Sequence, residues 1–239
     1  MKRTLYIVYL DAYHLGDRIF INDLADQIGQ SSDRPCLLVH GSGEKVERTL
    51  ESKGLFPERT NGVLDVSAPE HVQLVERAVR ETNQHIVGTL TDAVVPTVGA
   101  QGVDRRLLQM DEAGTVTAGK TGWVAALLNQ QVVPVISALV RHPKEGRVRE
   151  AYAVDATVAL AEALDDFDPT VVFFTRSDQP GLTDAHGPRD TVSTDALAAH
   201  DALPDPEAVR RVAEAHFEVL ITSPEGLFGG ERPAGTRLA

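Results

Sequence analysis

The segment Cys36-Leu-Leu-Val-His-Gly-Ser-Gly43 decides the fold class of this chain, and a candidate helix follows it directly from Glu44. Its apolar run is typical of a strand that is buried on both faces. Glycines at the start of a helix let backbone N–H groups approach an anion, and the helix dipole favours negative charge there. The segment therefore predicts a strand that ends at a candidate anion site, although a plain strand-to-helix turn fits the same pattern.

Strands and helices alternate on both sides of this segment. We expect strands at residues 4–10, 36–39, 93–98, 106–110, 132–137, 170–174 and 219–222. Apolar spacing and capping residues predict helices at residues 17–30, 44–53, 67–87, 122–130, 155–164 and 206–217. Parallel strands joined by helices predict an α/β fold, namely a three-layer α/β/α sandwich with a mainly parallel central sheet.

Local features refine this prediction. Ser67-Ala-Pro-Glu70 has the pattern of a capping box with proline early in the helix, so a helix is expected to begin there. Pro134 lacks a backbone donor, which places it at an edge, an end or a bulge of its strand. Residues 178–201 show little periodicity, and we expect them to form a long loop near the site. Asp155 is most simply a helix N-cap.

Composition indicates one globular domain over residues 1–239. The chain is 42% hydrophobic, carries a formal net charge of −12 and has a single cysteine, so collagen-like, disordered and disulfide-stapled classes are excluded. Cys36 is expected to pack as a small hydrophobic residue, which fits a reducing, cytoplasmic compartment. We expect no membrane span and no signal peptide. The negative charge disfavours nucleic acid and anionic membranes as partners, and the scattered histidines predict no metal site.

Turns that follow the strands carry the candidate functional residues, because open α/β sheets bind ligands beyond the carboxyl ends of their strands. The turn from His40 to Gly43 is the first, residues 99–104 form another, and the turn from Thr175 to Gly181 is a third. The third turn offers hydroxyl, guanidinium and carboxylate groups to a polar ligand. His40 fits either a substrate contact or a hydrogen-bonded structural imidazole.

Several blocks of the sequence are similar to known motifs and occur in the same order as those motifs. Leu38-Val-His-Gly-Ser-Gly43 is similar to a Val-His-Gly-Gly-Gly turn, and Gly99-Ala-Gln-Gly-Val-Asp104 to a Gly-x-x-Gly-x-Asp turn. Phe174-Thr-Arg-Ser-Asp-Gln-Pro-Gly-Leu182 is similar to a Leu-Thr-Asp-Val-Pro-Gly-Leu block with two extra residues. The other similar blocks are Asn61-Gly62, residues 127–136 and residues 235–238. Over nearly its whole length the chain thus resembles the amino-acid kinase family, and within it the N-acetylglutamate kinases.

This resemblance implies a kinase that moves the γ-phosphoryl group of ATP, with Mg, onto the side-chain carboxylate of an N-acyl amino acid, as in arginine biosynthesis. It implies an N-terminal lobe of about residues 1–150 on the acyl amino acid side and a C-terminal lobe of about residues 151–239 on the nucleotide side. A homodimer is implied as well. By position, the implied substrate-binding residues are His40, Gly41, Ser42, Gly43 and Asn61, the nucleotide-binding residues are Thr175, Asp178 and Gly181, and the catalytic residue is Asp155.

Several positions depart from the pattern of that family. Val8 stands in the place of a lysine of the first strand, and Leu10 and Asp11 stand in the places of two glycines. Leu64 replaces an arginine that grips the substrate, and the last lysine of the chain is Lys144, so a second family lysine further on has no counterpart. Three alternatives stay open: an acetylglutamate-kinase-like enzyme with an altered site, a catalytically silent homologue that acts as a ligand-binding or regulatory partner, and a kinase for another small anion.

Overall fold

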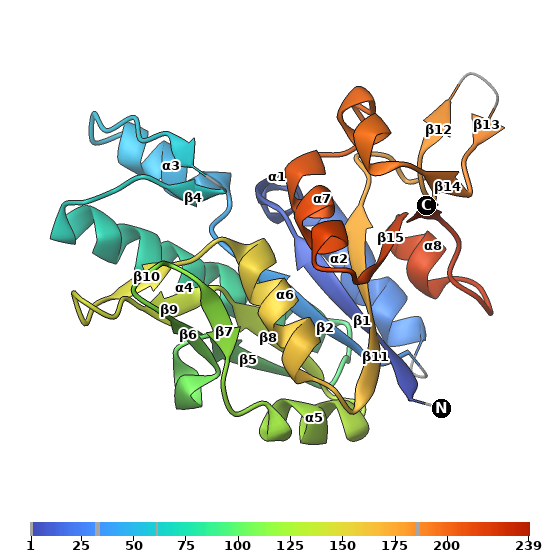
Figure 1. Cartoon of the computed structure of the whole chain (residues 1–239), viewed down its shortest axis with the longest axis horizontal. Coiled ribbons are helices and arrows are strands. Elements are labelled where there is room, and N and C mark those ends of the chain that lie inside the picture. Colours follow the sequence, from blue (N-terminus) through green and yellow to red (C-terminus); the bar gives the residue numbers. More distant parts are fainter. Residues whose placement is uncertain (1, 32–33, 61, 185–186) are drawn as a thin grey trace.

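A mainly parallel sheet forms the centre of the molecule (Figure 1). The structure is a computed structural model that describes residues 2–31, 34–60, 62–184 and 187–239. Within these residues the sheet has eight strands in the order β14-β16-β15-β11-β1-β2-β8-β5, and β15 and β16 pair antiparallel. The strands are β1 (Arg3–Leu10), β2 (Cys36–His40), β5 (Thr97–Gln101), β8 (Val133–Ser137), β11 (Phe167–Phe174), β14 (Thr191–Val192), β15 (Glu218–Thr222) and β16 (Thr236–Leu238). The predicted fold class is confirmed.

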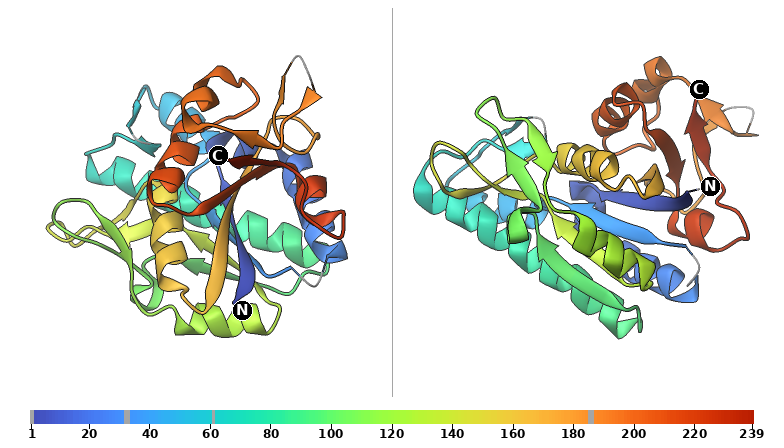
Figure 2. Two further views of the ribbon diagram at one scale, coloured as in Figure 1. Left: turned by 45° about the vertical axis from the view of Figure 1, so that its right-hand side comes forward. Right: turned by 60° about the horizontal axis from the view of Figure 1, so that its bottom comes forward.

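Helices cover both faces of this sheet (Figures 1 and 2). On one face lie α2 (Arg18–Gln30), α4 (Pro69–Asp92) and α8 (Pro224–Phe228), and on the other lie α5 (Gly122–Asn129), α6 (Ala153–Ala163) and α7 (Pro206–Glu214). Because successive side chains of a strand point to opposite faces, Val8 and Leu10 of β1 pack toward α2 and α4, whereas Ile7 and Tyr9 pack toward α6 and α7. Residues 5–10 of β1 are therefore apolar on both faces.

Short elements surround this three-layer core. Helices α1 (Ala12–Gly16) and α3 (Glu44–Glu51) follow β1 and β2, and α3 packs with the start of α4 in a small separate cluster. Two 3-10 turns are η1 (Asp104–Arg106) and η2 (Thr194–Ala199). Paired short strands are β3 (Arg59–Thr60) with β4 (Val63–Leu64), β6 (Leu108–Met110) with β7 (Val116–Ala118), β9 (Leu139–Arg141) with β10 (Val148–Glu150), and β12 (Thr183–Asp184) with β13 (Gly187–Pro188).

Several local predictions differ from the structure. The capping box is wrong, because α4 begins at Pro69 with Ala68 as N-cap and no side-chain cap; the residue before a proline is held outside the helix. Asp155 is not an N-cap either, since α6 begins at Ala153 after Tyr152. Strand β5 lies later than predicted, because α4 continues to Asp92. Pro134 is the second residue of β8, as expected for a strand end.

The segment 178–201 was expected to be a long loop, and its described residues are more ordered than that. They include β12, β13 and η2, and β14 pairs with β16 at the edge of the main sheet. Val192 and Leu197 are buried in the core and hold the segment against the sheet. Two isolated apolar anchors give no periodicity in the sequence, which is why the pattern suggested a loop.

The buried faces of β2 give the fold a direct test. Leu38 is 0% exposed within the sheet, whereas Ile19, near the start of α2, is 81% exposed. We expect Leu38→Ala to lower the free energy of unfolding by about 2–5 kcal/mol, because it leaves a cavity in a packed layer. The matched variant Ile19→Ala should change that free energy by less than about 0.5 kcal/mol. Denaturant titration measures both, and equal effects would contradict the assigned layering.

Candidate functional site

Two neighbouring cavities open where β1, β2 and β11 reach their carboxyl ends. The central cavity has a volume of about 310 Å³, and its walls include Tyr9, Asp11, Ser42, Glu150, Tyr152 and Asp205. The flanking cavity has a volume of about 400 Å³, and its walls include His14, Asp17, Thr175, Asp178 and Glu225. Tyr13 and Arg176 line both. The edge is the one at which parallel α/β sheets bind ligands.

The turn after β2 is closed by a carboxylate of the protein itself. The backbone N–H and the hydroxyl of Ser42 both donate hydrogen bonds to Glu150 at the end of β10, and the hydroxyl lies 2.8 Å from Oε2. A Cβ atom on Gly41 would lie 2.5 Å from Oε1 of Glu150, so this glycine makes room for the carboxylate. Burial raises the pKa of Glu150, and the bonds from Ser42 and the charge of Arg59 oppose that shift. The amide predicted to face an anion is thus occupied from within.

A second carboxylate, that of Asp205, accepts hydrogen bonds from two tyrosines. The hydroxyl of Tyr9, on β1, lies 2.9 Å from Oδ2 of Asp205, and the hydroxyl of Tyr152 lies 3.1 Å from the same oxygen. Oδ1 accepts from the backbone N–H of Ala208 and so caps α7. Burial, together with the negative charge of Asp205, raises the pKa of Tyr9 and of Tyr152. Both phenols therefore stay protonated and act as donors.

Asp11 is paired with a buried histidine. Nδ1 of His14 lies 2.8 Å from Oδ2 of Asp11, and Nε2 lies 3.1 Å from the carbonyl oxygen of Thr175. The buried ring therefore bridges a carboxylate oxygen and a carbonyl oxygen, both of which accept hydrogen bonds. His14 is 1% exposed. These contacts join the end of β1 to the end of β11. The carboxyl group of Asp11 is therefore bonded to a side chain of the protein itself.

A model of the amino acid kinase family matches residues 12–203 of this chain. The chain belongs to the amino acid kinase family. An acetylglutamate kinase of Streptomyces griseus is 29% identical over 143 residues, which cover 54% of this chain and 46% of that relative, so this match spans about half of the relative's length. An acetylglutamate kinase of Aeromonas hydrophila is 29% identical over 203 residues, which cover 80% of this chain and 76% of the relative.

Solved structures show the same fold. The N-acetylglutamate synthase of Neisseria gonorrhoeae, complexed with coenzyme A and N-acetyl-glutamate, superposes with a TM-score of 0.72 at 18% identity, over 99% of this chain and 59% of that one. An isopentenyl phosphate kinase superposes with a TM-score of 0.66 at 16% identity, over 98% of this chain and 100% of that one. These likenesses concern the fold alone, since proteins of one fold carry different functions.

Within this family fold, the predicted substrate residues occupy different surroundings. Ser42 and Gly41 line the central cavity, whereas Gly43 borders another hollow beside Leu15. His40 is 0% exposed: its Nδ1–H donates to the carbonyl of Gly41, and its Nε2 accepts from Asn83 at 3.0 Å. The structure thus favours the structural imidazole. Asn61 lies outside the described residues.

The predicted nucleotide-side residues are split in the same way. Thr175 and Asp178 line the flanking cavity, but the hydroxyl of Thr175 donates within its own turn to the carbonyl of Ser177 at 2.9 Å. Gly181 has a φ of +88°, and a Cβ there would lie 2.7 Å from the hydroxyl oxygen of Thr236, so packing accounts for this glycine. Asp155, the predicted catalytic residue, forms an ion pair with Arg211 of α7. It is not among the described residues that line either cavity.

The structure shows which of the altered family positions face the central cavity. Val8 is buried toward α2 and α4, so the side chain of β1 that faces the central cavity is Tyr9, one residue later. The lysine place is therefore better assigned to Tyr9, and the two glycine places to Asp11 and Ala12. Leu64 is buried in the small cluster beside α3. No lysine side chain that the structure describes lines either cavity.

Sequence reasoning missed four residues that shape the central cavity: Tyr9, Glu150, Tyr152 and Asp205. Strand alternation could have identified Tyr9. Glu150 and Tyr152 directly precede α6, which begins at Ala153, so their place at the start of a helix was the available signal. Asp205 directly precedes Pro206, a pattern of a helix N-cap. Their meeting at one point could not be read from the sequence, because 53 residues separate Tyr152 from Asp205.

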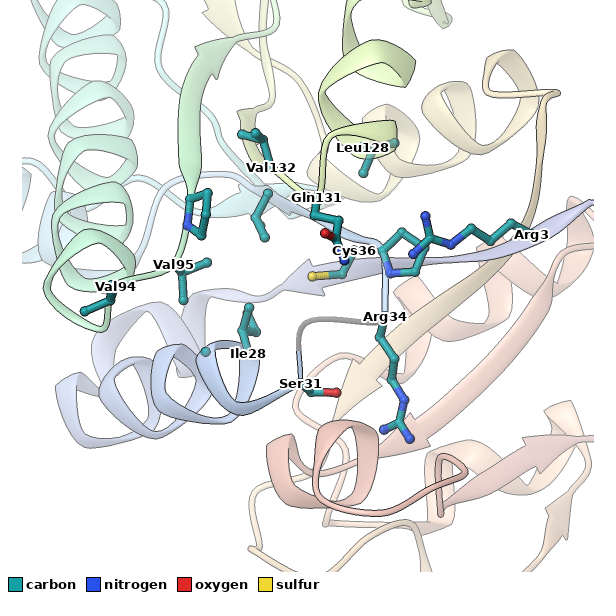
Figure 3. A pocket seen from close by; sticks show the side chains of 14 residues that line it. Arg3, Ile28, Ser31, Arg34, Cys36, Val94, Val95, Leu128, Gln131 and Val132 are labelled. Atoms are coloured by element: carbon teal, nitrogen blue, oxygen red, sulfur yellow. The ribbon is translucent and has the colours of Figure 1, made fainter.

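A third cavity lies at the opposite edge of the sheet, beside the start of β2 and β8 (Figure 3). Arg3 and Arg34 lie on one side of it, and Val94 and Val95 on the other. Cys36 lines it but is 2% exposed, and burial raises the pKa of its thiol to about 12, so it packs as a neutral small side chain. The expectation for Cys36 agrees with this packing, and the edge is the wrong one for the ligand of such a sheet.

In the part of the chain that the structure describes, no group of three or more histidine, cysteine, aspartate or glutamate side chains is arranged to hold a metal ion. Among the described helices, none combines the length and apolar character that crossing a membrane requires.

The buried imidazole of His40 predicts a pH dependence. Burial lowers the pKa of His40 to about 4, from an ordinary value near 6.5. The unfolded chain therefore binds a proton that the folded chain excludes, and folding stability should decrease as the pH falls from about 6.5 to about 4. The contribution of this one group is roughly 3 kcal/mol across that range.

The contribution of His40 is measured as the difference in the free energy of unfolding between two proteins. The wild type alone would not isolate it, because Glu150, with its raised pKa, changes stability with pH in the opposite direction. We expect denaturant titrations of the wild type and of His40→Gln to diverge at pH 7 and to converge as the pH approaches 4. A constant difference between them would show that His40 is already charged in the folded protein.

Proposed function

We propose that this chain is an acetylglutamate-kinase-like member of the amino acid kinase family that binds a small ligand in the central cavity and does not transfer a phosphoryl group. The observation that supports this most directly is the pair of hydrogen bonds from Ser42 to Glu150. An anionic substrate or transition state at this turn would compete with a carboxylate that is built into the chain. One lost donor of this kind slows related group transfers about 10²- to 10³-fold.

The charges around the central cavity support the same proposal. Phosphoryl transfer depends on positive groups that neutralise the developing charge. Here the walls carry the carboxylates of Asp11, Glu44, Glu150 and Asp205, against the guanidinium groups of Arg59 and Arg176. At 4 Å, each carboxylate would repel one phosphate charge by about 4 kcal/mol at an effective dielectric constant near 20.

ATP and Mg, which the family resemblance implies, do not fit the described residues. The flanking cavity carries Asp17, Asp23, Asp178 and Glu225, with Arg176 as its permanent cation. A polyphosphate there would face carboxylates on several sides. The acidic side chains do not gather into a metal-binding group in the described part of the chain. Neither group therefore has a part in the proposed function.

The competing function is ATP-dependent phosphorylation of the side-chain carboxylate of an N-acyl amino acid, as in arginine biosynthesis. The names of the relatives favour it, since the matched proteins of Streptomyces griseus and Aeromonas hydrophila are acetylglutamate kinases. The two open cavities at the expected edge of the sheet are compatible with it. The two functions differ in one measurable product, an acyl phosphate.

The test is a turnover assay with hydroxylamine, which traps acyl phosphates as hydroxamates. The purified chain receives ATP, Mg and N-acetylglutamate, and a curated relative such as the Aeromonas hydrophila kinase serves as the positive control under the same conditions. We expect no hydroxamate above the enzyme-free blank, because the cations needed at the phosphate are replaced by carboxylates. Hydroxamate above the blank with the wild-type chain would overturn the proposal.

A further inference from the structure

The third cavity, beside the starts of β2 and β8, has an apolar interior with a volume of about 160 Å³ (Figure 3). Its apolar walls come from α2, the turn after α4, the end of α5 and the starts of the two strands. An apolar cavity of roughly 150 Å³ accepts a molecule of the size of benzene. This cavity lies at the opposite edge of the sheet from the central cavity, so an occupant here is a second ligand, independent of the proposed function.

One wall of this cavity carries an apolar side chain on an unfavourable backbone conformation. Val94 follows α4 with a φ of +60°, and its side chain is 87% exposed. The backbone N–H groups of Val94 and Val95 donate to carbonyl groups of the last turn of α4, an arrangement in which glycine is the common residue. A β-branched residue at positive φ is rare, because its side chain crowds the backbone. An apolar molecule in the cavity supplies the contact that an exposed valine lacks.

The other residues with positive φ show that Val94 is an exception in residue type. Among the described residues other than glycine, those with positive φ are Val94, Arg105, Arg106, Gln131 and His216. Four of these five are polar or charged, and such side chains remain in water at no cost. Gln131, which follows α5, lines the same cavity as Val94. The one apolar member of the set therefore lies at an apolar cavity.

Positive charge lies on the other side of this cavity. Arg3, at the start of β1, and Arg34, just before β2, lie opposite the turn after α4 (Figure 3). Arg34 donates to the carbonyl groups of Leu227 and Gly230, which have no net charge, so it keeps its positive charge there. The described residues that line this cavity include no acidic side chain, whereas four acidic side chains line the central cavity and four line the flanking one. In a chain with a net charge of −12, this distribution favours an anion here.

We propose that the third cavity binds a small apolar carboxylate of about the size of benzoate. The apolar part of this ligand lies against the walls formed by Ile28 and Val133, and Val94 covers it from the side of α4. Its carboxylate lies toward the side of Arg3 and Arg34. Apolar burial supplies affinity, and the positive side of the cavity selects an acid over a neutral or cationic molecule of the same shape.

The closing experiment is calorimetric titration of the full chain with sodium benzoate at low ionic strength. Benzamide has the same shape without the charge, and benzamidinium has the same shape with the opposite charge. We expect saturable binding of benzoate, binding of benzamide that is at least about tenfold weaker, and no saturable binding of benzamidinium. N-acetylglutamate carries carboxylates without a comparable apolar part, and it should not compete with benzoate.

Two glycine variants test the role of Val94. Val94→Gly removes an apolar wall and suits the positive φ, so it should weaken benzoate binding at least about fivefold without lowering the midpoint temperature of thermal unfolding. His216 follows α7 with a φ of +62°, is exposed, and is not among the described residues that line this cavity. His216→Gly is therefore the matched control, and it should leave the affinity for benzoate unchanged.

Two arginine variants test the role of charge. Arg3→Gln removes a positive charge beside the cavity, so it should weaken benzoate binding and leave the weak binding of benzamide unchanged. Arg18, at the start of α2, is exposed and is not among the described residues that line this cavity. Arg18→Gln should change neither affinity.

Each contrary outcome overturns a stated part of the proposal. If benzoate does not bind saturably, the cavity is not a site for this class of ligand. Equal affinities for benzoate and benzamide would exclude recognition of the carboxylate. Equal effects of Val94→Gly and His216→Gly, or competition by N-acetylglutamate, would place benzoate outside this cavity. Hydroxamate formation in the turnover assay concerns the proposed function alone.

Discussion

The hydrogen bonds between Ser42 and the buried carboxyl group of Glu150 determine which groups the turn after β2 can offer to a ligand. They join the turn after β2 to the end of β10, and Glu150 is only 8% exposed. A buried carboxylate is unfavourable unless it is hydrogen bonded, and charge-assisted bonds of this kind contribute about 1.5–3 kcal/mol each. The turn before α3 thus faces an internal carboxyl group whose pKa burial raises. A ligand at this turn must fit the space and the hydrogen-bonding groups that Glu150 does not occupy.

The fold places this chain in a family of kinases, whereas the charges at the site disfavour phosphoryl transfer. Layers, strand order and the ligand-binding edge depend on apolar patterning, which tolerates exchanges among polar residues at the strand ends. Catalysis depends on a few charges at those same ends. Tyr9 in the place of a lysine and Asp11 in the place of a glycine leave the core of buried strands unchanged, while they remove one positive charge and add one negative charge at the strand ends. Membership of the family therefore places the cavity, and the side chains determine what enters it.

The sequence could predict the sheet, most helices and the edge that carries the site, because these depend on runs such as residues 4–10 and on spacing within one segment. It could not predict that Glu150 would reach Ser42, since 108 residues separate them and no local pattern connects a glycine turn with a distant acid. The assignment of Val8 instead of Tyr9 shows a second limit. A shift of one residue in a strand moves a side chain to the opposite face, and the composition of β1, apolar on both faces, hides that shift.

The contact of Tyr9 and Tyr152 with Asp205 also changes what the site needs from its ligand. A site built on two lysines repels itself until a phosphate lies between them, so in such a site ligand binding and closure are coupled. Here two protonated phenols and one carboxylate join β1, the start of α6 and the start of α7 without any ligand. The three elements are held together in the absence of a nucleotide. A protein preorganised in this way loses little conformational freedom when a small ligand enters, so less of the binding free energy is lost in ordering the site.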